Sequence, residues 1–356
     1  MSFGDNTLSW ADRRTQAKQS SRTDMPSTSS PWSYSGAAAD RLWHKSAIGR
    51  PAEGGSLLLS PAETLFVHHH RNVELPSDGW LETTLNADSF LMQKFAILEA
   101  LRVPGNKVIL AANLEVVGQT AQAESWAARW ASDSHPRDSS PIAEVRWFQD
   151  SDSLDSDGLF EWAERVGTNG RVAEVLVVDS ELSVVTYRVS SANPLGELDS
   201  TGVFAALGAT SGGVTSAGGR LYSNESWSIQ QLGVPTEAGV HVDGITCEII
   251  DGLEPLSEGA QILNDLLDRG LVMRPGFKYG TRWRCYDKPL GEDHAPYLVV
   301  LPSEAPHDWG GACLASRLAA GVNKIWLHPV QYGENWCYLA VTRPPADSRW
   351  SNPNRR

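Results

Sequence analysis

Residues Phe277-Lys-Tyr-Gly-Thr-Arg-Trp-Arg-Cys-Tyr286 form the stretch that decides the fold of this 356-residue chain. Over 281–286 the side chains alternate in character. Trp283 and Cys285 fall on one side of an extended chain, and the residues between and after them are arginines and a tyrosine. This period of two predicts a β-strand with one buried face.

Helices and strands are predicted on both sides of this strand. Leu263, Leu266 and Leu267 share one face of a helix over 256–268, and Gly270 stands where a glycine ends a helix. The further predicted elements are a strand over 297–301, a helix that ends at Gly321, and strands over 324–330 and 336–342 joined by a turn at 331–335.

The chain carries a faint internal repeat. Val103-Pro-Gly-Asn-Lys-Val108 resembles Arg274-Pro-Gly-Phe-Lys-Tyr279. A helix-like stretch ending at Gly170 leads into an apolar strand, as Gly321 leads into Val322-Asn-Lys-Ile-Trp326. We interpret the chain as two tandem copies of one α/β unit that meet near residue 195, with chance similarity as the alternative. The predicted fold class is α/β (α+β).

The predicted organisation has five parts. The first is rich in Ser, Thr, Asp and Gln and indicates a flexible tail. A Gly-, Ser-, Thr- and Ala-rich segment at 206–219 is typical of a linker or an insertion. The parts are the tail at 1–38, the N-terminal module of the first copy at 39–102, its second module at 103–195, the N-terminal module of the second copy at 196–270, and the last module at 271–356.

Composition limits the classes of protein to which the chain can belong. No stretch approaches the roughly 18 apolar residues of a membrane span, and the N-terminus lacks the apolar core of a signal peptide. The four cysteines are scattered without a CxxC pair, which favours reduced thiols in a cytoplasmic protein. We expect no membrane association.

Charge is unevenly distributed. The net charge is −13, yet residues 269–288 hold six cations and one anion, which gives 6 − 1 = +5. Arginines also gather between residue 343 and the C-terminus. Because salt screens charges over about 10 Å, a local basic patch on an acidic protein can still bind phosphates. The alternative is a solvated charged face.

Tyrosine, histidine and lysine occur in an order that suits RNA cleavage. Attack of a ribose 2′-hydroxyl on the neighbouring phosphate needs a base, an acid for the departing 5′-oxygen and a cation near phosphorus. Tyr286, His294 in Gly291-Glu-Asp-His-Ala-Pro-Tyr297, and Lys324 offer these three functions. Arg282 and Arg284 share a strand face with the tyrosine and would favour its phenolate form.

These stretches resemble the catalytic domain of tRNA-splicing endonucleases, in archaea and in the catalytic subunits of the eukaryotic enzyme. The resemblance covers roughly 256–345 and rests on three motifs in the family's order: K-[FY]-G-x-x-[FWL]-x-x-Y, H-[AS]-x-Y and V-x-K. It implies a tRNA-intron lyase with Tyr286 as base, His294 as acid and Lys324 as transition-state stabiliser. Each copy is then a small α/β module plus a restriction-endonuclease-like nuclease module with a mixed central sheet.

The resemblance also implies an RNA clamp. In this family two side chains hold a bulged base at the splice site. Arg317 corresponds to the first of them, and Arg343, with Trp350 as the substitute, to the second. Together with Arg282 and Arg284 these residues are the predicted RNA-binding set. The substrate is precursor tRNA with a bulge–helix–bulge, and neither a cofactor nor a metal ion is expected.

The first copy is predicted to be catalytically silent. The repeat alignment sets Glu115 against Tyr286 and Glu174 against Lys324, and acidic groups there would repel a phosphate. The resemblance then implies a homodimer in which an acidic turn of the silent copy docks on the partner. Asp179 and Glu181 are the candidate interface residues.

Two alternatives and one further motif remain. The chain can instead be a non-catalytic, structural RNA-binding subunit of a splicing endonuclease. A metal-dependent nuclease of related fold is disfavoured because the clustered carboxylates it needs are missing from the sequence. His68-His-His70 cannot all bind one ion, since consecutive side chains point in different directions, and a structural role is favoured.

Overall fold

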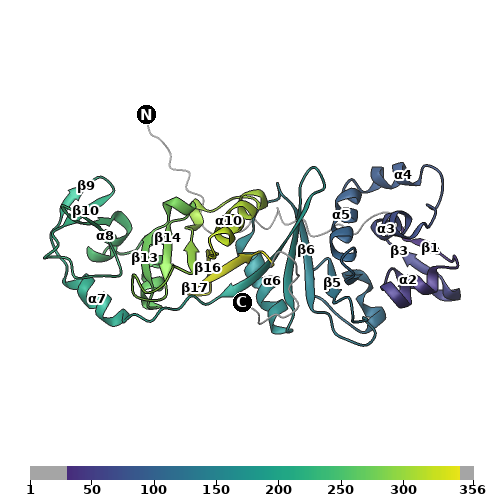
Figure 1. Ribbon diagram of the computed structural model, residues 1–356, viewed down its shortest axis with the longest axis horizontal. Coiled ribbons are helices and arrows are strands. Elements are labelled where there is room, and N and C mark those ends of the chain that lie inside the picture. The colour runs from purple at the N-terminus through teal and green to yellow at the C-terminus, as the bar shows by residue number, and fades with distance from the viewer. Residues whose placement is uncertain (1–29, 345–356) are drawn as a thin grey trace. The chain divides into compact units, whose positions relative to one another are not determined.

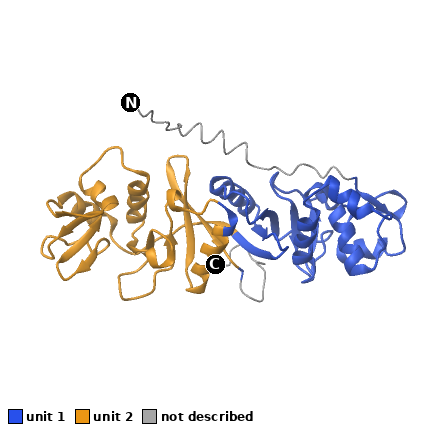
Figure 2. Cartoon of the chain, turned by 90° about the horizontal axis from the view of Figure 1, so that it is seen from above, with its two compact units in different colours: residues 1–188, 308–310, 344–356 blue, residues 189–307, 311–343 orange. Residues whose placement is uncertain are grey.

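The computed structural model describes residues 30–344. The chain forms two compact units, shown in Figure 2. Unit 1 comprises Met1–Arg188, Asp308–Gly310 and Pro344–Arg356, and unit 2 comprises Val189–His307 and Gly311–Arg343. The fold is a mixture of helices and strands, as the sequence predicts. No helix within 30–344 is long and apolar enough to cross a membrane.

Unit 1 begins with a three-stranded sheet in the order β1-β3-β2, accompanied by four helices. Trp32 and Tyr34 of β1 pack against the core, so the predicted tail of 1–38 is too long. A capping box between Ser60 and Glu63 begins α3. The elements are β1 (Trp32–Tyr34), α2 (Ala39–Ser46), β2 (Arg50–Pro51), η1 (Glu53–Gly55), β3 (Leu57–Leu59), α3 (Pro61–Arg71), α4 (Trp80–Ala87) and α5 (Leu91–Arg102).

The second part of unit 1 is a mixed sheet. β4 and β5 are antiparallel, as are β5 and β6, whereas β6 and β7 are parallel because α6 crosses between them. All seven residues of β7 are buried, which explains its apolar sequence. The elements are β4 (Lys107–Leu110), η2 (Ala111–Val117), β5 (Ala127–Trp130), β6 (Ala143–Gln149), α6 (Ser156–Thr168), β7 (Val172–Val178) and β8 (Val184–Ala192), which continues into unit 2.

Unit 2 begins with a four-stranded sheet in the order β11-β12-β10-β9. The segment 206–219 is more than a linker, since it includes the end of α7, the whole of β9 and the start of β10. Gly270 has φ +75° and ends α9 as predicted. The elements are α7 (Ser200–Ala209), β9 (Val214–Ser216), β10 (Gly219–Tyr222), β11 (Val234–Thr236), β12 (Gly239–Asp243), α8 (Gly244–Ile250) and α9 (Glu258–Asp268).

The second part of unit 2 contains a run of five hydrogen-bonded strands in the order β13-β14-β15-β16-β17, drawn in green to yellow in Figure 1. The strands predicted over 281–286, 297–301, 324–330 and 336–342 all form, with ends shifted by one to two residues. The elements are β13 (Val272–Pro275), η3 (Phe277–Tyr279), β14 (Trp283–Tyr286), β15 (Tyr297–Val299), η4 (Pro302–Glu304), α10 (Trp309–Gly321), β16 (Ile325–Tyr332) and β17 (Asn335–Thr342).

The same topology occurs in the mixed sheets of both units. In each, two antiparallel pairings precede a parallel pairing across a helix: β4-β5-β6-α6-β7 in unit 1 and β13-β14-β15-α10-β16 in unit 2. This recurrence is what two copies of one unit would produce. The common origin of the two halves and the five domain boundaries stay predictions.

The sheet of unit 1 contains a buried ion pair that provides a test of the fold. Arg129 Nε donates to Glu174 at 2.5 Å, and both side chains are at most 1% exposed. We expect Arg129→Met to lower the free energy of unfolding by about 3–5 kcal/mol, because it leaves the Glu174 carboxylate buried without its cation. Arg129→Met with Glu174→Met should recover most of that loss in urea denaturation.

The control is the pair of Arg165 and Glu124, whose side chains are 41% and 37% exposed. Arg165→Met should change the free energy of unfolding by less than about 1 kcal/mol, because water screens that pair. Equal losses in Arg129→Met and Arg165→Met would contradict the expectation.

Candidate active site

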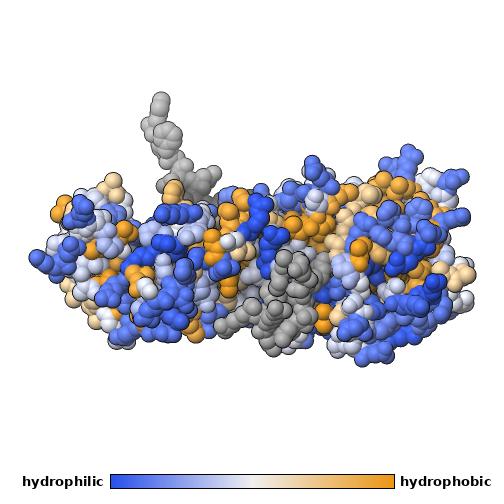
Figure 3. Space-filling model, in the orientation of Figure 1, coloured by the Kyte–Doolittle hydropathy of each residue, from blue (hydrophilic) through white to orange (hydrophobic). Residues whose placement is uncertain are grey.

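Strand β14 separates a core face from a polar face. Cys285 is fully buried, and burial raises the pKa of its thiol, whereas Arg284 and Tyr286 on the other face are half-buried. Across the β13–β14 ladder Arg284 faces Arg274, which lies within the basic stretch 269–288 and is not among the predicted site residues. Hydrophilic residues dominate the surface over β13 and β14 in Figure 3.

Sheet register brings Tyr286 and Lys324 into one row. One step beyond the last pair of the β14–β15 ladder, Tyr286 faces Pro296. One step before the first pair of the β15–β16 ladder, Pro296 lies beside Lys324, and the Ile325 N–H donates to the Pro296 carbonyl at 2.9 Å. Residues in one row share a face of the sheet, and a span of two strands is about 10 Å. Tyr286 and Lys324 therefore emerge on the same face.

His294 lies in the loop that enters β15, two residues before Pro296. The residue is exposed, and its backbone N–H donates to Asp293 Oδ1 at 2.7 Å. That hydrogen bond, and then Lys288 at 3.5 Å, lowers the pKa of the Asp293 carboxyl. The Asp293 carboxylate thus fixes the backbone of His294 and leaves the imidazole accessible to solvent.

Lys324 connects its strand to the loop that carries the histidine. Its ammonium donates to the carbonyl of Ala295, next to His294, at 2.5 Å. Asn323 before it has φ +54°, which the short amide side chain tolerates, and the Lys324 N–H donates to the Ala319 carbonyl. All three predicted catalytic residues therefore belong to one set of linked backbone segments.

Arg282, just before β14, and Arg284, within it, differ in their contacts. Arg282 forms ion pairs with Asp243 at 3.3 Å and Glu304 at 3.7 Å, so its charge is partly neutralised. Arg284 donates through Nε to the Pro275 carbonyl, and its guanidinium carbon lies 6.0 Å from the centre of the Tyr286 ring. Arg284 is therefore the cation nearest to the phenol on that strand.

The two described candidate clamp residues lie on elements that a hydrogen bond joins. Ser316 Oγ donates to the Val341 carbonyl at 2.7 Å and fixes α10 to the end of β17. Arg317 directly follows Ser316, Arg343 comes two residues after Val341, and both arginines are exposed. Trp350 lies outside the described residues.

The connection before Lys324 recurs in unit 1 and shows which residues correspond. Asn323 and Gly170 both have positive φ, +54° and +68°. Arg171 therefore corresponds to Lys324. Four backbone N–H to carbonyl hydrogen bonds are equivalent in the two units. In unit 2 they run from Val322 to Ala319, Asn323 to Ala320, Lys324 to Ala319 and Ile325 to Pro296. In unit 1 they run, in the same order, from Asn169 to Val166, Gly170 to Gly167, Arg171 to Val166 and Val172 to Ile142.

The predicted repeat alignment is wrong at both catalytic positions. Glu115 lies in the 3-10 helix η2 and not in a strand, and Glu174 lies inside β7. The last residue of β5, Trp130, faces the first residue of β4, as Tyr286 faces the first residue of β13. Trp130 therefore corresponds to Tyr286. The alignment matched Gly170 to Gly321 because both are glycines, although the left-handed residue of unit 2 is an asparagine.

Unit 1 has a cation in the position of Lys324, but its charge is neutralised. Arg171 Nη1 donates to Glu144 at 2.9 Å and to the Thr120 carbonyl at 2.6 Å. Trp130 is buried, and its indole N–H donates to the Ser139 carbonyl at 2.9 Å. These residues offer neither a proton acceptor nor an uncompensated cation to a substrate.

Asp179 and Glu181 lie in the turn between β7 and β8. Asp179 Oδ1 accepts the N–H groups of Glu181 at 2.9 Å and Ser183 at 2.8 Å, so this carboxylate stabilises the turn itself. Glu181 is exposed. The interface role of the two residues stays a prediction.

The histidine run of α3 has structural contacts. His68 Nδ1 contacts the Val73 carbonyl at 2.8 Å, and His70 Nε2 contacts Glu99 Oε1 at 2.6 Å. His69, His70 and Glu99 each have a ligand atom within 4.8 Å of the others, so these three residues can approach one metal ion. The contacts of His68 and His70 agree with the structural role that the sequence favours.

Comparison with known proteins identifies the region that holds this site. Residues 260–334 match the model of the family described as "tRNA intron endonuclease, catalytic C-terminal domain". A tRNA-splicing endonuclease of Thermoplasma volcanium is 34% identical over 95 residues, which are 27% of this chain and 32% of that protein. One from Hyperthermus butylicus is 38% identical over 68 residues, 19% of this chain and 38% of that protein.

A longer match extends beyond the catalytic region. A tRNA-splicing endonuclease of Methanosarcina mazei is 25% identical over 342 residues, which are 86% of this chain and 94% of that protein. The two shorter matches span only about a third of their relatives. The resemblance to archaeal tRNA-splicing endonucleases is thus confirmed for the region of the candidate site.

His328 gives the site strand a predicted pH dependence. Burial lowers the pKa of His328 on β16 from 6.5 to about 4, against the hydrogen bond to the Pro329 carbonyl, which raises it. In the unfolded chain the His328 imidazole therefore takes up a proton near pH 6.5, while in the folded protein it stays neutral down to about pH 4. The free energy of unfolding therefore keeps its full value above pH 6.5 and falls by about 3 kcal/mol as the pH is lowered towards pH 4.

Urea denaturation between pH 7.5 and pH 4.5 measures this effect. His328→Asn keeps a donor near the Pro329 carbonyl and removes the titration, so its stability should fall less with pH than that of the wild type. The exposed residue His294 supplies the control, since His294→Asn should retain the wild-type slope. Equal slopes in the wild type and in His328→Asn would contradict the assignment.

Proposed function

Because residues 260–334 match the model of the tRNA intron endonuclease catalytic domain, we propose that the protein is a tRNA-splicing endonuclease. It acts in the cytoplasm on precursor tRNA and cuts at the bulge–helix–bulge that marks each intron boundary. The relatives from Thermoplasma volcanium and Methanosarcina mazei carry the same name.

The observation that supports this proposal best is the row across β14, β15 and β16. Tyr286 and Lys324 emerge on one face, and the Lys324 ammonium contacts the carbonyl next to His294. A base, an acid and a cation are what attack by an internal hydroxyl requires. The three residue types thus occur together on a surface that the core does not occupy.

The proposed reaction is a metal-independent transesterification. The Tyr286 oxygen accepts the proton of the 2′-hydroxyl, and the 2′-oxygen forms a bond to phosphorus. The bond to the 5′-oxygen breaks, and His294 gives that oxygen its proton. Lys324 stabilises the charge on the phosphate oxygens during the exchange. The products are a 2′,3′-cyclic phosphate and a 5′-hydroxyl end.

RNA is bound through shape and through splayed bases in this proposal. Arg317 and Arg343 stack on a bulged base from two sides, an interaction worth about 1–3 kcal/mol per base. Trp350 is the substitute for Arg343. Arg284 and Arg282 contribute positive charge beside the cleaved strand, with Arg284 the more effective of the two because Arg282 is paired with carboxylates.

We further propose that the enzyme is a homodimer. A bulge–helix–bulge has two cleavage points, and the corresponding residues of unit 1 lack the groups for catalysis. A second copy of the chain then supplies the second active site, with the turn of Asp179 and Glu181 at the interface.

Cleavage of a bulged precursor tRNA in excess EDTA tests the activity. The wild type should cut twice. Tyr286→Phe, His294→Ala and Lys324→Ala should each lower the single-turnover rate by about 10²–10⁴, because acid–base and electrostatic catalysis are lost. His307→Ala is the matched control, since it removes another exposed histidine of unit 2 and should leave the rate unchanged.

The outcomes separate the proposal from its rivals. Binding without cutting by the wild type would favour the non-catalytic RNA-binding subunit. Cutting that EDTA abolishes would indicate a metal-dependent nuclease. Cutting that survives the triple variant Tyr286→Phe, His294→Ala, Lys324→Ala would dismiss the site assignment.

Sedimentation velocity tests the homodimer. The wild type should sediment as a dimer, and Glu181→Gln should weaken the association at least tenfold, since it removes an exposed charge from the proposed interface. Glu164→Gln removes an exposed charge from α6 and should leave the association unchanged. A monomeric wild type at micromolar concentration would rule out this part of the proposal.

A further inference from the structure

Four cations surround one pocket in unit 1, well separated in sequence from the catalytic motifs. The pocket has a volume of about 70 Å³ and lies where α2, α3 and α5 end and β4 begins. Its nine lining residues include no acidic side chain. The cations are Lys45, Arg71, Arg102 and Lys107.

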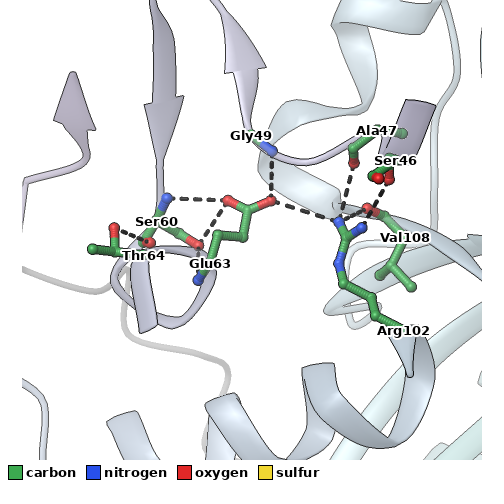
Figure 4. Close-up of polar contacts among 8 residues, drawn as sticks. All are labelled: Ser46, Ala47, Gly49, Ser60, Glu63, Thr64, Arg102 and Val108. Carbon is green, nitrogen blue, oxygen red and sulfur yellow. Dashed lines mark hydrogen bonds and ion pairs between the residues drawn. The ribbon is translucent and has the colours of Figure 1, made fainter. Parts of the chain in front are cut away.

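Arg102 is the buried cation of this pocket, with its side chain 3% exposed. Figure 4 shows its guanidinium between Glu63 and three carbonyl groups. Nη1 donates to Ser46 and Nη2 to Ala47, each at 3.0 Å, and Nη2 also donates to Val108. Its Nε is buried and has no hydrogen-bond partner among residues 30–344.

The other three cations retain donors for a ligand. Lys45 is exposed and has no ion-pair partner within the described part of the chain. Arg71 donates through one nitrogen to the His70 carbonyl at 2.9 Å. Lys107 donates once, to the Ser132 carbonyl at 2.5 Å, and an ammonium has three donors.

The balance of charge at the pocket is positive. Among residues 30–344 the four cations form one ion pair, between Arg102 and Glu63 at 3.8 Å, so the sum over these five groups is 4 − 1 = +3. Three helices end here, and each C-terminus contributes about −0.5 charge. The remainder is roughly +1.5, which shows that the cations do more than compensate the helix ends. Burial lowers the pKa of Arg102 to about 10, with Arg71 adding to the effect, so Arg102 stays charged at neutral pH.

We propose that this pocket binds one phosphate group. A phosphate presents up to two charges and several acceptor oxygens, which suits donors that approach from the ends of three helices and from β4. A single carboxylate has less charge and fewer acceptors. The phosphate group can be free, as inorganic phosphate, or can be a phosphodiester of an RNA bound to unit 1.

Calorimetric titration with inorganic phosphate tests the pocket. The full-length protein is used with Lys324→Ala, which removes the proposed phosphate-stabilising cation of the active site, and any phosphate binding that remains at the arginines there is common to all variants compared. Lys45→Gln and Arg71→Gln should each weaken binding at least tenfold, equivalent to about 1.4 kcal/mol. Arg41→Gln, one turn earlier on α2 and also exposed, is the matched control and should bind phosphate as before.

Equal affinity in the pocket variants and the control, or the absence of phosphate binding, would overturn the proposal. If RNA displaces bound phosphate, the occupant is a phosphodiester; if it does not, the occupant is a free phosphate, and either result supports the site. Neither arm uses RNA cleavage, so failure of the pocket and failure of the proposed function are distinguishable.

Discussion

The parallel pairing of β15 with β16 is the constraint on which the candidate site depends. Parallel neighbours cannot be joined by a tight turn, so α10 must cross between them and return the chain at the same edge of the sheet. The residue that re-enters the sheet there is Lys324, beside the loop of His294. The antiparallel pairing of β14 then adds Tyr286 to the same row. The pairing of three neighbouring strands thus places Tyr286 and Lys324, which lie 38 positions apart in the sequence, in one row.

Unit 1 has the same pairing and the same return after α6, with different side chains. A tryptophan occupies the place of the tyrosine, and Arg171 occupies the place of the lysine with Glu144 bonded to it. The backbone arrangement therefore does not by itself determine whether a tyrosine and an unpaired cation stand at these two positions. The difference between the two units lies in which polar groups the core and the neighbouring carboxylates already satisfy.

Much of unit 2 could be predicted from the sequence because its strands alternate and its helix ends carry glycine. The order Tyr286, His294, Lys324 also indicated the site. The alignment of the two copies is wrong because glycine marks the left-handed residue after the helix in unit 1, whereas Asn323 adopts that conformation in unit 2. The phosphate pocket could not be predicted, since Lys45 and Lys107 come together only through the ends of three helices.

The contact of Lys324 with the Ala295 carbonyl has a consequence for the energetics of turnover. A flexible ammonium in water must lose rotamer freedom and shed solvent before it can meet a phosphate. Here the carbonyl already holds the side chain in an ordered rotamer, so a smaller reorganisation accompanies substrate arrival. For the proposed reaction the lysine is therefore preorganised, and the entropy of ordering its side chain would be lost on folding and not at each turnover.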